Sequence, residues 1–196
     1  MKLLLLIMDI PLLCFGRKMS DGEQLQIVNS LEAGDVVLAA DRLFPLWQLF
    51  AKLVSGSNYY HSGIYVGGGQ IIEATTYYPE GSGVRRTNVY NFVSGYKTCC
   101  VVRPPYASPA ERNKVLNFAA AQLGKPYDYA MKSEENGAYY CTKLVAESLK
   151  TANIFVKTKT FFGKKAFSPD DFIKIQNAKI IYGKNENVLF AVLLQI

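Results

Sequence analysis

Histidine is nearly absent from this chain: among its 196 residues, only His61 carries an imidazole. The ordinary pKa of imidazole lies close to neutral pH, so proton transfer by imidazole has a single candidate here. The four cysteines include no C-x-x-C pair, whereas structural zinc sites usually combine four Cys and His ligands. With a single histidine and no C-x-x-C pair, the sequence therefore argues against a zinc site.

Long apolar segments are also missing. The apolar run at residues 3–7 is soon followed by Asp9, and it is too short to span a membrane. A basic start with a short apolar run is typical of a secretory signal, although no Ala-x-Ala site follows it. Residues 1–16 are therefore either a signal or an apolar leader that packs on the domain. The first reading predicts export or membrane attachment in the periplasm or cell envelope, and the second a cytoplasmic protein.

Basic charge is not concentrated anywhere. The chain has 22 Lys and Arg and 16 Asp and Glu, a formal net charge of +6, and the basic residues are scattered. No basic stripe alternates with aromatic residues, so we expect no nucleic-acid partner. A hydrophobic content of 49% argues against disorder. Residues 17–196 fit one domain with a real core, which we expect to act as a monomer.

The hydrophobic pattern predicts an α+β fold, in which an antiparallel sheet has its helices segregated on one side. Strands are expected at 36–39, 61–66, 70–74, 99–103, 180–181 and 189–194. Helices are expected at 43–54, from the cap at Ser108 to Gly124, at 142–152, and after a cap at Ser168. Residues 75–95 and 125–138 are expected to be loops. The adjacent Cys99 and Cys100 should point to opposite faces of a strand as packed thiols rather than form a disulfide.

Cys141 is expected at the N-terminus of the helix 142–152. The unpaired N–H groups and the helix dipole at that position favour an anion. They would lower the pKa of the thiol and could also hold an oxyanion on a substrate carbonyl. A lone cysteine under a helix is more often a packed side chain. A catalytic role for Cys141 therefore requires other functional side chains beside it as partners.

His61 and Glu73 supply those partners. They lie on two expected strands joined by the glycines at 67–69, a sequence that suits a tight hairpin. His61 could take the proton of the Cys141 thiol and return it to a leaving group. Glu73 lies among apolar neighbours, and a buried carboxylate needs a partner such as imidazolium. The alternative for Glu73 is a strand residue that faces solvent.

The order of the motifs resembles a known family. His-Ser-Gly-Ile-Tyr-Val-Gly at 61–67, Ile-Ile-Glu-Ala at 71–74, Gly-Lys-Pro-Tyr-Asp at 124–128 and Tyr-Cys-Thr-Lys-Leu-Val at 140–145 are similar to those of the circularly permuted NlpC-like papain-fold enzymes, the YiiX/YaeF-like amidases. The resemblance covers roughly residues 32–182. In papain-like enzymes the cysteine precedes the histidine, whereas here it follows, as permutation implies. The position of a triad in the chain matters less than its geometry.

The resemblance implies a triad of Cys141 as nucleophile, His61 as base and Glu73 as the residue that orients the ring. It also implies a tyrosine upstream of the cysteine that helps to hold the oxyanion. Tyr127 is the best match, and Tyr60 and Tyr140 are the nearest alternatives. Relatives often carry an acidic residue two positions after the cysteine, where this chain has Lys143, which leaves the triad intact but weakens an exact analogy of substrate.

The implied activity is hydrolysis of amide bonds through a thioester, on peptides, especially cell-wall-type peptides, or on acyl-amide substrates. It requires no metal and no organic cofactor. One alternative is a lipid acyltransferase or acyl hydrolase of the lecithin:retinol acyltransferase-like type, with membrane association through the N-terminus. A second alternative is an inactive binding module, against which the complete set of His61, Glu73 and Cys141 argues. Residues 75–97 and 153–167 are expected to line the cleft.

Overall fold

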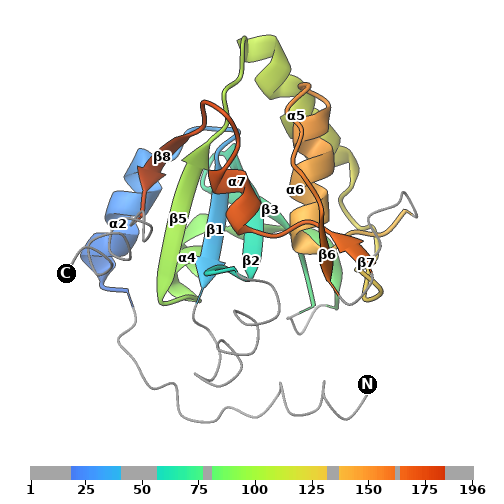
Figure 1. The fold of residues 1–196 in the computed structure, drawn as a ribbon. Helices are drawn as coiled ribbons and strands as arrows, with labels where there is room; N and C mark the ends of the chain where they lie inside the picture. The colour runs from blue at the N-terminus through green and yellow to red at the C-terminus, as the bar shows by residue number, and fades with distance from the viewer. Residues whose placement is uncertain (1–18, 41–56, 77–80, 132–136, 162–163, 184–196) are drawn as a thin grey trace, which may run out of the picture.

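A six-stranded antiparallel sheet forms the centre of the protein, with the strand order β4-β3-β2-β1-β5-β8 (Figure 1). The computed structural model describes residues 19–40, 57–76, 81–131, 137–161 and 164–183. The sheet strands are β1 (Val36–Ala40), β2 (His61–Gly67), β3 (Gln70–Thr75), β4 (Gly83–Asn88), β5 (Thr98–Arg103) and β8 (Lys179–Tyr182). The helices are α2 (Asp21–Ser30), α4 (Val89–Ser94), α5 (Pro109–Ala121), α6 (Cys141–Lys150) and α7 (Asp170–Ile173). A separate pair of strands, β6 (Lys159–Phe161) and β7 (Lys164–Ala166), follows α6.

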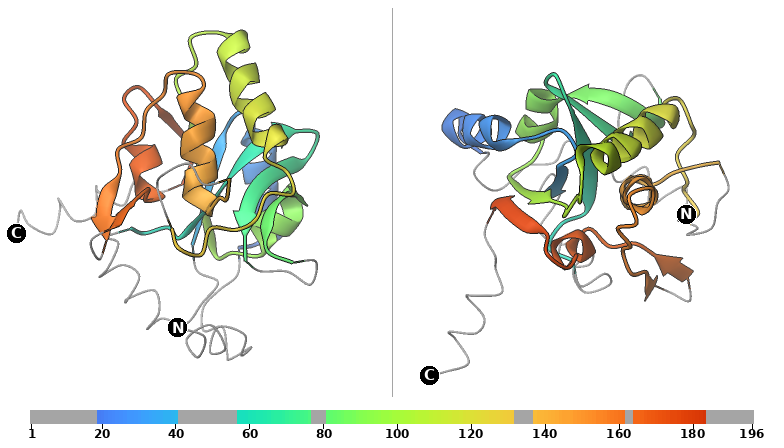
Figure 2. Two further views of the ribbon diagram at one scale, coloured as in Figure 1. Left: turned by 90° about the vertical axis from the view of Figure 1, so that its right-hand side faces the viewer. Right: turned by 90° about the horizontal axis from the view of Figure 1, so that it is seen from above.

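Helices cover both faces of the sheet (Figure 2). Val36 and Leu38 of β1 face the side covered by α5, α6 and α7. Val37 and Ala39 face α2 and α4 on the other side. The expectation that the helices lie on one side is therefore wrong. The physical reason is that β1 is apolar at every position, and a strand buried on both faces needs a covering layer on each.

The edge strand β4 and the helix α4 lie where the sequence pattern predicts a loop, while the short helix expected after Ser168 is present as α7. Residues 75–95 are not a loop throughout, because the structure has β4 and α4 there. The edge strand β4 is mostly polar and only Val84 among its residues is buried, so it shows no apolar alternation. The expected cap at Ser168 is also absent: α7 begins at Asp170 after Pro169, with no side-chain cap. Ser168 lies just outside the helix, and its backbone carbonyl, not its hydroxyl, accepts a hydrogen bond from the Asp171 N–H at 3.1 Å.

Other expectations are met. Ser108 caps α5 by accepting a hydrogen bond from the N–H of Glu111, with proline at the start of the helix. Cys99 and Cys100 point into opposite core layers as free thiols. The leader at 1–16, the helix expected at 43–54 and the strand expected at 189–194 lie outside the described residues.

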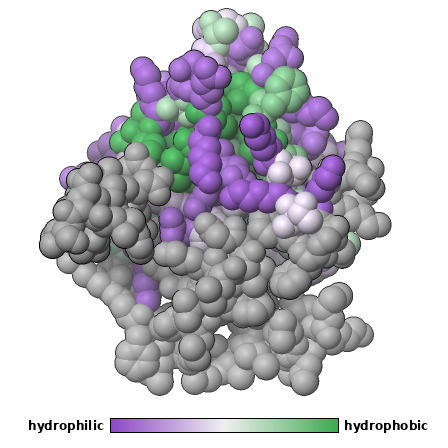
Figure 3. Space-filling model, in the orientation of Figure 1, coloured by the Kyte–Doolittle hydropathy of each residue, from purple (hydrophilic) through white to green (hydrophobic). Residues whose placement is uncertain are grey.

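The described surface is mixed in character. In the view of Figure 3, polar side chains surround a smaller apolar area in the upper half of the molecule. Within the ranges that the structure describes, no helix is both long enough and apolar enough to cross a bilayer.

Candidate active site

The hairpin of β2 and β3 brings His61 and Glu73 together. Its turn uses glycines with positive φ, 59° at Gly68 and 71° at Gly69, a conformation that suits glycine. Gly63 pairs with Glu73 across the two strands, and His61 lies two residues before Gly63 on the same face. His61 Nε2 therefore reaches Glu73 Oε2 at 2.5 Å. Both side chains are nearly inaccessible, with 10% and 4% of their surface exposed.

Glu73 has a donor on each of its oxygens. His61 contacts Oε2, while the Thr87 hydroxyl donates to Oε1 at 2.5 Å and Arg85 Nη2 lies 3.4 Å from the same atom. Burial alone would raise the pKa of Glu73. The hydrogen bond and charge of His61, followed by Thr87 and Arg85, outweigh burial and lower the pKa to about 2. The carboxylate is therefore ionised at neutral pH.

Cys141 is the first residue of α6 and is 8% exposed. Its Sγ lies 3.9 Å from the backbone carbonyl oxygen of Tyr60, the residue that precedes His61. Burial opposes ionisation, but the hydrogen bond and charge of His61 and the backbone N–H groups of Thr142 and Ser62 lower the pKa of Cys141. For His61, burial also opposes the charged form, and Cys141 and Glu73 raise its pKa to about 10. The pair therefore favours a thiolate beside an imidazolium.

Aromatic rings pack against the imidazole. The centroid of Phe92, in α4, lies 5.5 Å from that of His61, and Tyr96, just after the same helix, lies 5.8 Å away and nearly parallel. Aromatic faces attract cations within about 6 Å. These rings pack against the imidazole and restrict its rotation.

The three candidate tyrosines have different environments. Burial and then the charge of Cys141 raise the pKa of Tyr127, whose backbone forms a bridge with Tyr139, two residues before Cys141. The Tyr140 hydroxyl is fully buried and accepts a hydrogen bond from the backbone N–H of Phe167. The group of Tyr60 that faces Cys141 is its backbone carbonyl, 3.9 Å from the sulfur. Because the Tyr140 hydroxyl is engaged with Phe167 and Tyr60 faces Cys141 with its carbonyl, Tyr127 stays the preferred candidate.

The segment that leads into β2 is fixed by a buried carboxylate. Asp170 of α7 accepts hydrogen bonds from the Ser57 hydroxyl at 2.6 Å and from the backbone N–H groups of Asn58 and Tyr59. These contacts hold the chain immediately before His61. His61 is thus held in two ways: Asp170 of α7 fixes the residues before it, and Glu73 contacts its ring.

Among the described residues, no group of three or more His, Cys, Asp and Glu side chains is placed to hold a metal ion.

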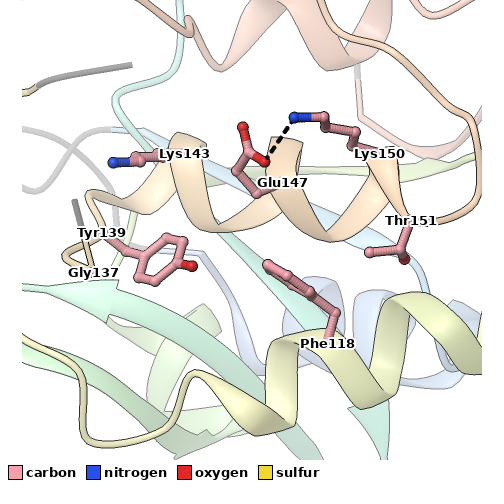
Figure 4. A pocket seen from close by; sticks show the side chains of 7 residues that line it. All are labelled: Phe118, Gly137, Tyr139, Lys143, Glu147, Lys150 and Thr151. Atoms are coloured by element: carbon pink, nitrogen blue, oxygen red, sulfur yellow. Dashed lines mark hydrogen bonds and ion pairs between the residues drawn. The ribbon is translucent and has the colours of Figure 1, made fainter. Parts of the chain in front are cut away.

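A separate pocket lies between α5 and α6 (Figure 4). Its volume is about 220 Å³, and it is lined by Phe118, Gly137, Tyr139, Lys143, Glu147, Lys150 and Thr151. None of the three candidate residues lines it. We therefore place the chemistry at the end of the sheet where β2 begins, and not in this pocket.

Sequence reasoning proposed Cys141, His61, Glu73 and Tyr127. The structure places Glu73 against His61 and the sulfur of Cys141 near the Tyr60 carbonyl, and the roles of all four stay predictions. Sequence reasoning also expected residues 75–97 to line the cleft, Tyr96 among them, but it missed the contacts of Thr87, Arg85 and Phe92 with Glu73 or His61. All of the missed residues lie in or next to β4 and α4, where a loop was expected. The alternation of Val84, Arg86 and Asn88 with Arg85 and Thr87 was too weak a signal to reveal a strand.

Comparison with known protein families shows which class of protein this fold and site belong to. The sheet, the helix that begins at Cys141 and the position of the cysteine after the histidine are those of a permuted papain-like protein. A family model described as the permuted papain-like amidase enzyme, YaeF/YiiX, C92 family, matches residues 30–188. The chain belongs to this family. The α+β permuted papain-like fold expected from the motifs is confirmed, and an amidase in general is what the family indicates.

Two individual proteins are similar to this chain. A crystal structure described as the metalloprotein YiiX from Escherichia coli O157:H7 superposes with a TM-score of 0.65 at 18% identity, covering 79% of this chain and 98% of that one. At this identity it supports the fold alone. A protein named aspartate 1-decarboxylase from Pyrobaculum islandicum (strain DSM 4184 / JCM 9189 / GEO3) is 34% identical over 107 residues, which are 55% of this chain and 79% of that protein.

Proposed function

We propose that this protein is a cysteine hydrolase that cleaves amide bonds through a thioester. Cys141 is the nucleophile, His61 the general base and acid, and Glu73 the residue that orients His61. The observation that carries the proposal is the line of Glu73, His61 and Cys141. Glu73 contacts His61 at 2.5 Å, and Cys141, at the start of α6, has its sulfur 3.9 Å from the carbonyl oxygen of Tyr60, the residue before His61. This line supplies each part of an activated thiol.

The reaction follows from these positions. The Cys141 thiolate attacks the carbonyl carbon, and the charge that develops on the carbonyl oxygen is met by the Tyr127 hydroxyl and by N–H groups at the start of α6. The His61 imidazolium then gives its proton to the leaving amine, and a thioester remains on Cys141. Neutral His61 next takes a proton from water, which attacks the thioester and releases the acid and the thiolate.

The proposed substrates are peptides, including cell-wall-type peptides, and acyl amides. A second candidate, acyl transfer or hydrolysis on lipid-like substrates, is favoured by one observation. Tyr129 and Met131, on the segment directly after Tyr127, are 55% and 46% exposed. Exposed apolar side chains beside the proposed site would suit an acyl chain. In this reading the same thioester forms, and the acceptor is an alcohol or amine instead of water.

The test is the intact mass of the protein after incubation with peptide pools and with lipid pools. We expect an acyl adduct that maps to Cys141, and the pool that forms it distinguishes the two substrate classes. Loss of CO₂ from aspartate is assayed in parallel, because one protein similar to this chain is named aspartate 1-decarboxylase. Turnover that survives in Cys141→Ser would exclude the thiol mechanism, and no adduct from either pool would favour a binding module.

Selective alkylation tests the activated thiol without a substrate. Limiting iodoacetamide should label Cys141 before Cys99 and Cys100, because burial raises the pKa of both and brings that of Cys100 to about 11. His61→Ala should slow labelling of Cys141 near neutral pH, because the imidazolium that stabilises the thiolate is lost. Equal labelling of all three thiols would count against an activated Cys141.

A further inference from the structure

A buried ion pair joins the helix that carries Cys141 to the segment that carries Tyr127. Lys143 Nζ lies 3.7 Å from Asp128 Oδ2, and only 2% and 4% of these side chains are exposed. Charges so deeply buried are costly unless they are paired. Lys143 is two residues after Cys141, which places it about 200° around α6 and so on nearly the opposite side of the helix. The pair is therefore not part of the line from Glu73 to Cys141.

The pair acts on a segment that has no regular secondary structure. Asp128 directly follows Tyr127, and its other carboxylate oxygen accepts a hydrogen bond from the N–H of Ala130 at 3.1 Å. The backbone N–H of Asp128 donates to the carbonyl of Tyr139, and the N–H of Tyr139 donates to the carbonyl of Pro126, each at 3.0 Å. Tyr127 is thus held in a single bridge to the chain just before Cys141. A short bridge of this kind needs additional support to fix a side chain.

The other end of the same segment is attached to the sheet. The N–H of Val84 in β4 donates to the carbonyl of Lys125 at 2.9 Å, and the N–H of Gly124 donates to the carbonyl of Val84 at 2.9 Å. A Cβ at Gly83 would lie 2.6 Å from the Lys125 carbonyl oxygen, so the close approach depends on glycine. The segment therefore spans from β4 to α6, with Tyr127 between the two attachments.

We infer that the Lys143–Asp128 ion pair is a positioning device, which holds the Tyr127 hydroxyl against the start of α6 so that it can meet the oxyanion. This inference rests on the proposed function. It also explains why a lysine is tolerated in so buried a position: its charge fixes the segment 125–131 rather than taking part in proton transfer. Neither Lys143 nor Asp128 touches the substrate, so both are positioning residues.

Two reagents separate thiolate formation from oxyanion stabilisation. Alkylation by iodoacetamide displaces iodide at a saturated carbon and forms no oxyanion, so its rate reports the Cys141 thiolate. Acylation by p-nitrophenyl acetate passes through a tetrahedral oxyanion before p-nitrophenolate leaves, so its burst rate reports the thiolate and the oxyanion donors together. The ratio of the ester rate to the alkylation rate therefore isolates the donors.

The experiment compares this ratio in four variants. Tyr127→Phe should lower it by about a hundredfold, the usual effect of removing one oxyanion donor. Lys143→Met and Asp128→Asn should each lower it by roughly tenfold or more through misplacement of Tyr127, with alkylation unchanged within about twofold. Lys150→Met is the matched control, because its side chain is 61% exposed and pairs with Glu147 on the surface of the same helix. It should leave both rates unchanged.

A combined variant shows whether the pair acts through Tyr127. Adding Lys143→Met to Tyr127→Phe should lower the ratio no further, because the hydroxyl that the pair positions is already gone. If Tyr127→Phe lowers the ratio but Lys143→Met and Asp128→Asn do not, the inference is overturned while the proposed function stands. An unchanged ratio in Tyr127→Phe overturns the role of Tyr127 in the proposed function and the inference with it.

A variant that only damages the fold would give a different pattern of rates. If Lys143→Met lowers alkylation and acylation equally, the pair only maintains α6 and the inference is wrong. If Lys143→Met does not fold, Asp128→Asn decides, because asparagine retains an acceptor for the N–H of Ala130 and removes only the charge that pairs with Lys143.

Discussion

Each oxygen of the Glu73 carboxylate has its own donor, and this fixes the plane of the group. His61 contacts one oxygen, while Thr87 and Arg85 contact the other. A carboxylate held only by the imidazole could rotate, and the ring would rotate with it. The strand β4 therefore contributes to the orientation of His61, although none of its residues touches Cys141 in any contact described above.

Removal of the Thr87 hydroxyl tests this orientation. Thr87→Val keeps the shape of the side chain and should lower turnover by roughly tenfold to a hundredfold, the usual cost of losing a residue that orients a functional histidine. Thr87→Ser keeps the hydroxyl and should retain most of the activity. The measurement is the steady-state rate with p-nitrophenyl acetate. Equal activity of the valine variant and the wild type would show that Thr87 does not orient Glu73.

The pKa shifts of Cys141 and His61 predict two different pH profiles. Alkylation by iodoacetamide should rise with pH through a pKa below 9.0, the ordinary value of the thiol, and should stay high at alkaline pH because the thiolate persists. Hydrolysis of a peptide or anilide substrate also needs the imidazolium as acid, so it should fall as pH rises through about 10, where His61 loses its proton. Profiles that coincide at alkaline pH would argue that His61 is not the acid.

At the scale of the elements, close contact between β2 and β3 sets the distance from His61 to Glu73. Gly63 faces Glu73 across the two strands. A Cβ at Gly63 would lie 2.5 Å from Ile71 Cγ2 and 3.3 Å from the carbonyl oxygen of Ile72. Any side chain at this position would push the strands apart, so the hairpin geometry depends on the absence of one.

Gly63→Ala should therefore destabilise the protein by about 1–3 kcal/mol, the usual cost of overpacking, and should also lower activity. Gly22→Ala is the matched control, and it should stabilise the protein instead. A Cβ there meets nothing within 4 Å, and α2 should gain about 0.5–1 kcal/mol from a better helix former. Urea denaturation measures both. Similar midpoints for the two variants would show that the close contact at Gly63 is easily relieved.

The elements that the sequence predicted are those with local signals. The hairpin of β2 and β3 is marked by its glycine turn, and α5 by Ser108 and Pro109. The start of α6 could be inferred from the apolar face that follows Cys141. The strand β4 and the helix α4 are fixed instead by pairing with β3 and by burial of Phe92 and Val93, which depend on residues distant in the sequence.

The same distinction explains the site. His61, Glu73 and Cys141 were found because their chemical types are rare or unusual in their local sequence. Thr87 and Arg85 are ordinary polar residues, and their meaning comes only from the register that places Arg85 opposite Glu73. The Lys143–Asp128 pair was also beyond sequence reasoning, because only the folded chain shows that both residues are buried.

At the scale of the whole molecule, the candidate site lies where the two helical layers meet at the end of the sheet. Cys141 comes from α6, which packs on one face, and Phe92 comes from α4, on the other. His61 is contacted from both layers. Because the site joins the layers, ionisation of its groups is coupled to global stability, and the fold should weaken when these groups change charge.

Acid unfolding measures this coupling through Glu73. Its pKa is about 2 in the folded protein against an ordinary value of 4.5. A lowered pKa contributes stability that is present above pH 4.5 and is lost as pH falls toward 2, because the unfolded chain binds the proton first. The free energy of unfolding of the wild type should fall by about 3 kcal/mol more than that of Glu73→Gln over this range.

Denaturation by urea at several pH values compares the two proteins. Asp21→Asn, at an exposed position in α2, should follow the wild type. Parallel curves for the wild type and Glu73→Gln would mean that the folded protein does not hold Glu73 as a carboxylate, and the ion pair with His61 would then be excluded.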